Sequence, residues 1–112
     1  MRRQAFEVDC GEAARRMVEG YIVVPGLFGV YKNRVLSAAV NWNWRWRVTH
    51  LPTGLNAGKK EGYADRASAA IIADKLSKVR APWHATSKAE FTRLRRRPKW
   101  KAATERARKI VR

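Results

Sequence analysis

The fold is decided by residues 42–50, where the chain reads Trp42-Asn43-Trp44-Arg45-Trp46-Arg47-Val48-Thr49-His50. Apolar residues and one histidine occupy the even positions of this stretch, and polar or charged residues occupy the odd positions. Successive side chains of a β-strand point to opposite faces of its sheet, so the alternation predicts a strand with an apolar face and a polar face. The apolar face is expected to form the inner side of the sheet, since an aromatic side chain buries about 150–250 Å².

Two other uses of the tryptophan face remain open. Exposed tryptophans form a platform on which the bases of a single strand stack, and large exposed apolar patches mark protein contacts. If the tryptophans are buried, the opposite face carries Asn43, Arg45, Arg47 and Thr49. Arginine can read guanine and asparagine can read adenine, and both also bind phosphates. This polar face is therefore a candidate nucleic-acid-binding surface, with an ordinary solvated sheet face as its alternative.

Turn signals and short apolar runs place further elements before and after this strand. Residues 21–24 and 27–32 predict a hairpin around Pro25-Gly26, and residues 52–54 predict a tight turn. The chain is then expected to return through residues 55–63, exposing Lys59 and Lys60. Residues 9–19 predict a short helix, because Asp9 and Glu12 have capping-box spacing.

The second half of the chain predicts helices. Residues 65–79 begin at Asp65, a good N-cap, and repeat apolar residues at helical spacing. Ser87 and Glu90 have capping-box spacing for a helix over 88–97, which Pro98 should break, and residues 99–112 again show helical spacing. We therefore expect an α+β fold: a small antiparallel sheet of three or four strands packed on one main helix, with basic C-terminal helices. The expected division is a core domain over 1–82 and a basic helical extension over 83–112.

Positive charge is the strongest feature of the composition. The 112 residues hold 25 lysines and arginines against 9 acids, giving a formal net charge of +16. Residues 80–112 hold 12 basic and 2 acidic residues, whereas residues 1–40 hold 6 and 4. A polyanion relieves such self-repulsion and releases its condensed counterions when cations meet phosphates. The composition therefore predicts a nucleic-acid partner, with an anionic membrane surface or an acidic protein as alternatives.

The densest positive run surrounds Pro98, and it consists of Arg93, Arg95, Arg96, Arg97, Lys99 and Lys101. Five or more like charges close together often mark a nucleic-acid-binding segment. A solvated helix face is the plainer interpretation of the run. A helix lying on a membrane surface is a third, although its apolar stripe is thin.

A resemblance to known families rests on residues 44–65. The strand ending at His50, the turn at Pro52-Thr53-Gly54, the return through residues 59–63 and the alanine-rich helix from Asp65 look like the end of a three-stranded sheet followed by a helix. This arrangement is similar to the arm-type DNA-binding domain of phage integrases and to plant AP2 domains, and small phage proteins also look like this. The resemblance implies that the sheet enters the DNA major groove, with Arg45 and Arg47 as contacts.

Signals for catalysis, cofactors and membrane insertion are weak in this sequence. His50 and His84 have no cysteine, serine or carboxylate partner at informative spacing, and the single cysteine, Cys10, cannot form an internal disulfide. No Cys/His cluster, phosphate-binding glycine loop or paired acids of a nuclease metal site is evident, so no metal or cofactor is expected. No apolar run approaches about 18 residues, so no membrane span is expected, and a cytoplasmic or nucleoid location follows.

The sequence thus predicts a non-catalytic nucleic-acid-binding protein that holds duplex DNA through a basic sheet face and an arginine-rich C-terminal helix. A phage-type inhibitor or regulator of a host nucleic-acid enzyme, acting by protein contact, is the first alternative. An RNA-binding or ribosome-associated protein is the second, because basic residues do not distinguish DNA from RNA.

Overall fold

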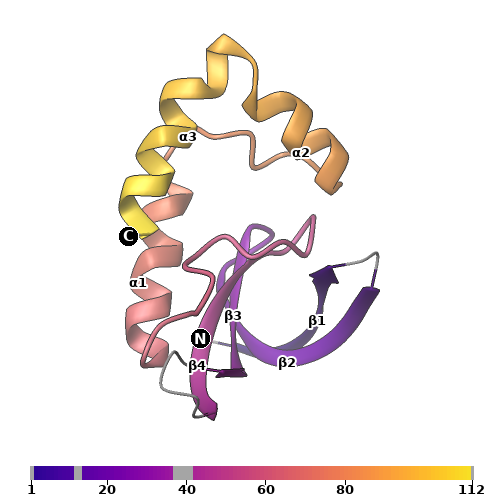
Figure 1. The fold of residues 1–112 in the computed structure, drawn as a ribbon, viewed down its shortest axis with the longest axis vertical. Helices are drawn as coiled ribbons and strands as arrows, with labels where there is room; N and C mark the ends of the chain where they lie inside the picture. Colours follow the sequence, from indigo (N-terminus) through magenta and orange to yellow (C-terminus); the bar gives the residue numbers. More distant parts are fainter. Residues whose placement is uncertain (1, 12–13, 37–41, 112) are drawn as a thin grey trace.

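The computed structural model describes residues 2–11, 14–36 and 42–111, with side chains for all of these except 2, 10, 11, 14, 34–36 and 42–44. Within these ranges one antiparallel sheet is followed by three helices, which confirms the α+β class (Figure 1). The strands, in their order across the sheet, are β1 (Arg2–Gly11), β2 (Ala14–Val24), β3 (Phe28–Leu36) and β4 (Trp42–His50). The helices are α1 (Arg66–Ser77), α2 (Lys88–Arg95) and α3 (Pro98–Val111).

The helix expected over residues 9–19 is wrong, because this region belongs to the β1–β2 hairpin. The two strands pair antiparallel, with Phe6 opposite Val18. Phe6 and Val8 are buried on one face of the sheet, whereas Glu7 between them is exposed. Alternation with a period of two along both strands thus outweighs the capping-box spacing at Asp9, which had favoured a helix.

The sheet curls so strongly that its first strand meets the turn after its last. The backbone N–H of Asp9 in β1 donates to the Gly54 carbonyl at 2.8 Å, and Gly54 adopts the positive φ of 74° that favours glycine (Figure 1). Phe6, Val8 and Tyr31 form a small buried cluster inside the curl. Gly20 is needed there, because a Cβ atom would overlap the Val30 carbonyl oxygen and come within 3.0 Å of the Phe6 ring.

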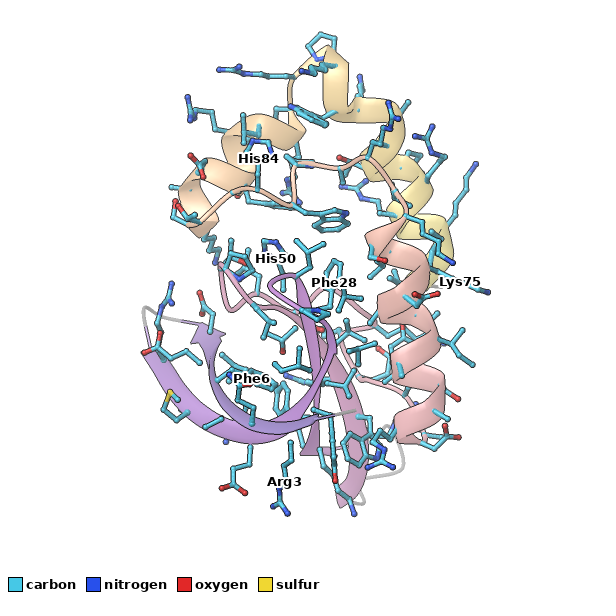
Figure 2. All side chains as sticks on the ribbon, turned by 180° about the vertical axis from the view of Figure 1, so that it is seen from behind. Arg3, Phe6, Phe28, His50, Lys75 and His84 are labelled. Carbon is cyan, nitrogen blue, oxygen red and sulfur yellow. The ribbon has the colours of Figure 1, made fainter. Side chains whose placement is uncertain are left out.

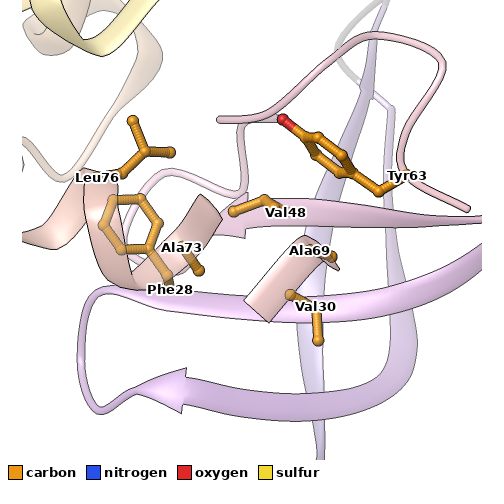
Figure 3. Close-up of a cluster of buried hydrophobic side chains, with 7 residues drawn as sticks. All are labelled: Phe28, Val30, Val48, Tyr63, Ala69, Ala73 and Leu76. Carbon is orange, nitrogen blue, oxygen red and sulfur yellow. The ribbon is translucent and has the colours of Figure 1, made fainter. Parts of the chain in front are cut away.

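The main core lies on the other face of the sheet, between β3, β4 and α1. Its buried members are Phe28, Val30, Val48, Tyr63, Ala69, Ala73 and Leu76 (Figure 3). The predicted helix over 65–79 is confirmed as α1, and its N-cap Asp65 accepts a hydrogen bond from the Ser68 N–H at 2.7 Å. Trp46 is half-buried against this core, as expected for the inner face of the predicted strand. Trp42 and Trp44 have side chains outside the described residues.

The chain between β4 and α1 forms no regular strand, contrary to the expected return over residues 55–63. It touches β4 through two isolated bridges, Thr49 with Asn56 and Trp46 with Tyr63. The Tyr63 hydroxyl donates to the Val111 carbonyl at 3.2 Å. This loop therefore links the sheet to the last turn of α3.

The two C-terminal helices form an arch at the end of the molecule opposite the curl of β1 and β2 (Figure 1). Ser87 caps α2 as predicted, and its hydroxyl accepts from the Glu90 N–H at 3.1 Å. Pro98 separates α2 from α3 and occupies the first position of α3, where its missing N–H costs no helical hydrogen bond. The end of α3 packs Ala107, Ile110 and Val111 against the main core.

Candidate functional site

The exposed lysines and arginines of α2 and α3 form the C-terminal cationic surface. Each helix buries few side chains, since Leu94 is the buried residue of α2 and Ala103 is the buried residue of α3. Most of the lysines and arginines at the other positions are therefore exposed to solvent. The exposed members are Lys88, Arg93, Arg96, Arg97, Lys99, Lys101, Arg106, Arg108 and Lys109, and Arg95 is half-buried.

Few carboxylates neutralise this surface. Among the described residues there are four ion pairs, and the single pair in α2 or α3 joins Arg108 to Glu105 at 3.7 Å. The other acid of these helices, Glu90, accepts from the Thr86 backbone N–H at 2.8 Å. By contrast, two pairs cross the β1–β2 hairpin, Arg3 with Glu19 and Arg15 with Glu7. The positive potential is therefore concentrated on α2 and α3, as the charge distribution of the sequence predicts.

The junction of α2 and α3 contains a small cationic hollow of about 370 Å³. Its cations are Arg95 and Arg96 from the end of α2 and Lys101 and Arg108 from α3, and its one acid among the described residues is Glu105, which pairs with Arg108. Side chains that are far apart in an extended chain are thus gathered where one phosphate group can contact several of them.

A larger cleft of about 540 Å³ lies between the arch and the loop that follows β4. Its aromatic lining comes from His50, Trp83 and Phe91, and the last two rings stack at 5.8 Å with an interplanar angle of 20°. Its cations are Lys88, Arg95 and Arg108, and Asp9 is its one acid among the described residues. The cleft thus combines an aromatic wall with a positive rim.

His50 holds the aromatic wall against the sheet. It points from the end of β4 toward the arch, whereas His84 lies beside α2 (Figure 2). Its Nε2–H donates to the Trp83 carbonyl at 2.7 Å, and in the neutral ring Nδ1 accepts from the Thr53 hydroxyl at 2.8 Å. Both ring nitrogens are therefore occupied by structural hydrogen bonds. Burial lowers the pKa of His50 from its ordinary value of 6.5, and the Trp83 carbonyl opposes this shift in part.

We expect the free energy of unfolding to decrease as pH falls below 6.5. The unfolded chain protonates His50 near its ordinary pKa of 6.5, whereas the folded chain protonates it at lower pH, so protons favour unfolding in this window. Urea unfolding from about pH 7.5 down to about pH 5 would measure the slope, above the range in which most carboxylates titrate. His50→Gln should remove it, and exposed His84→Gln should retain it. An unchanged slope in His50→Gln would show that another group is responsible.

The sheet arginines do not join the C-terminal cationic surface. Arg45 and Arg47 lie on the face of β4 that shares the curl with Tyr31, opposite to the face that packs on α1. Arg45 donates from Nη2 to the Gly62 carbonyl at 2.9 Å. The Nε atoms of both arginines are covered by neighbouring atoms, and neither has a hydrogen-bond partner among the described residues.

The remaining predicted site residues have different outcomes. The expectation that Thr49 is exposed is wrong, because the curl of the sheet and the bridge to Asn56 leave it 1% exposed. The side chain of Asn43 lies outside the described residues, as does that of Cys10. Lys59 and Lys60 lie in the loop that reaches α3, since the Lys59 N–H donates to the Tyr63 hydroxyl, which donates to Val111.

The cleft could not be predicted from the sequence, because its lining comes from five separate segments of the chain. Trp83 was a weak signal for it, being a large apolar residue between the predicted helices. Within the described ranges, no three metal-ligating side chains cluster, and no helix has the length and apolar character to cross a membrane. Comparison of the chain with protein-family models, curated proteins and solved structures finds no match.

Proposed function

We propose that the protein is a non-catalytic nucleic-acid-binding protein that holds phosphate backbones on its C-terminal cationic surface. The observation that carries the proposal is the charge of residues 88–111, which contain ten lysines and arginines against two acids. Nine of these cations are exposed, and one is in an ion pair. Phosphates that meet such a surface release condensed counterions, which drives binding without sequence-specific contacts.

The helices support this role better than the sheet does. Insertion of the sheet into a major groove needs an exposed, outward polar face, whereas Thr49 is buried and the Nε atoms of Arg45 and Arg47 are covered. The apex of the α2–α3 arch, where the two helices meet, instead projects away from the core, so a strand of nucleic acid can approach it (Figure 1).

Binding measurements at several salt concentrations test the proposal. We expect labelled duplex DNA, single-stranded DNA and RNA all to bind at low salt. The same titrations test whether duplex DNA is the preferred partner. If six or more cations contact phosphates, affinity for duplex should fall by about a thousandfold between about 50 and 200 mM salt. Absence of binding to all three at low salt would overturn the proposal. Affinity that does not depend on salt would exclude phosphate contacts as its basis.

A further inference from the structure

We infer that the cleft between the arch and the β4 loop binds one unpaired nucleotide, with its base against Phe91 and its phosphate among Lys88, Arg95 and Arg108. This inference rests on the proposed function and adds a ligand class to it. The cleft is about 540 Å³, within the range of about 300–1,000 Å³ typical of small-ligand sites. It is therefore large enough for a nucleotide unit.

The aromatic wall provides a stacking surface for a base. Phe91 lies on α2, is partly exposed and lines the cleft. Its ring contacts the rings of Trp83 and His50. Trp83 fixes this geometry, because its Nε1–H donates to the Leu76 and Val79 carbonyls at the end of α1. The wall is thus held in place before any ligand arrives, which lowers the ordering cost of binding.

The rim provides the counter-charge for a phosphate. Lys88 and Arg95 stand one at each end of α2, and Arg108 approaches from α3. The Thr92 hydroxyl also lines the cleft and has no hydrogen-bond partner in the described part of the chain, so it can donate to a phosphate oxygen. The aromatic wall of the cleft thus matches the base of a nucleotide, and its positive rim matches the phosphate.

An unpaired nucleotide fits the cleft better than a base pair does. In a duplex, each base is covered on both faces by its neighbours in the stack, so its ring face is unavailable to Phe91. Single-stranded segments and ends present unstacked bases that aromatic side chains can contact. Every base has such a face, so the cleft should accept DNA and RNA strands with little sequence preference.

The test compares single strands with duplex in variants of the full chain. The probes are a five-residue oligothymidylate, a five-residue oligouridylate and a short blunt duplex, each titrated by fluorescence anisotropy. Phe91→Leu should weaken binding of the two single strands at least about fivefold, because base–aromatic stacking is lost. Phe91→Tyr retains the ring and should restore the affinity. Duplex affinity should change by less than about twofold in both variants, since phosphate contacts dominate it.

A charge-matched pair of variants tests the phosphate position. Arg95→Gln and Arg93→Gln remove the same charge from the same helix, but Arg95 lines the cleft and Arg93 does not. We expect Arg95→Gln to weaken single-strand binding at least about threefold more than Arg93→Gln does. Arg95 can form a charge-assisted hydrogen bond to a phosphate in the cleft, and such bonds are stronger than those between neutral groups.

The outcomes separate this inference from the proposed function. Equal losses for single strands and duplex in Phe91→Leu, or no loss in either, would overturn the nucleotide cleft while leaving phosphate binding intact. Failure of the wild-type protein to bind any of the three probes at low salt would overturn both. Thermal unfolding of each variant provides the folding control, and the comparison of Arg95→Gln with Arg93→Gln tests the cleft if Phe91→Leu does not fold.

Discussion

Replacement of Arg93, Arg96, Arg97 and Lys101 with glutamine should weaken nucleic-acid binding at least about a hundredfold at about 0.1 M salt. The four side chains are exposed and lie in no ion pair among the described residues, so their charge is available to phosphates. If all four contact phosphates, the slope of log affinity against log salt should become shallower by about 3–4 units. Fluorescence anisotropy at several salt concentrations measures both quantities. None of the four lines the cleft, so nucleotide binding there does not obscure the result.

A control variant removes the same charge far from the arch. The control residues are Arg3, Arg16, Lys32 and Arg66, which are exposed on β1, β2, β3 and the first turn of α1, and Arg3 lies at the opposite end of the molecule from His84 and α2 (Figure 2). Their replacement with glutamine lowers the net charge equally, so long-range steering decreases while the C-terminal cationic surface is unchanged. We expect a loss of less than about tenfold in this control, since it removes no phosphate contact. Equal losses in the two variants would mean that total charge, and not its position, governs binding.

Phe28→Ala should lower the free energy of unfolding by about 3–5 kcal/mol. Phe28 is 0% exposed and packs against Val30, Val48 and Leu76 in the main core (Figure 3). Its ring also meets that of Trp83 edge-to-face at 5.0 Å, so the truncation removes contacts to both the sheet and the base of the arch. Since domains of this size are stable by about 5–15 kcal/mol, the loss is a large fraction of the total.

Urea unfolding followed by tryptophan fluorescence measures this loss. Met17→Ala is the control, because Met17 lies on β2 with 61% of its surface exposed and should cost no more than about 0.5 kcal/mol. Phe28→Leu leaves a smaller cavity and is the variant to use if Phe28→Ala does not fold. Losses at Phe28 that are no larger than the loss at Met17 would contradict the placement of Phe28 at the centre of the core.

Local sequence signals predicted the elements that depend on interactions between residues close together in the sequence. Asp65 and Ser87 are N-caps in the structure as in the sequence, because a cap depends on a side chain and an N–H three residues away. The alternation around Arg45 and Val48 likewise identified β4. The same kind of signal failed at Asp9, where pairing between distant strands determined the backbone conformation and a local capping pattern did not.

Tertiary geometry accounts for what the sequence did not reveal. The odd positions of β4 were expected to face solvent, but a sheet that curls onto itself has two buried faces, and Thr49 is covered for that reason. The curl depends on Gly20, where one missing Cβ makes room for the Phe6 ring, and no periodic pattern records such a contact. The cleft likewise forms where α2 packs on His50 and Trp83. These two residues are 33 positions apart in the sequence, so no local pattern relates them.

Hydrogen–deuterium exchange of the backbone amides, with and without a saturating single-stranded oligonucleotide at low salt, tests the location of binding most directly. We expect the oligonucleotide to slow exchange in residues 88–111 and to leave unchanged the rates of residues 17–24 of β2, which do not line the cleft. Slower exchange confined to the β1–β2 hairpin and the strands, with α2 and α3 unaffected, would contradict this location.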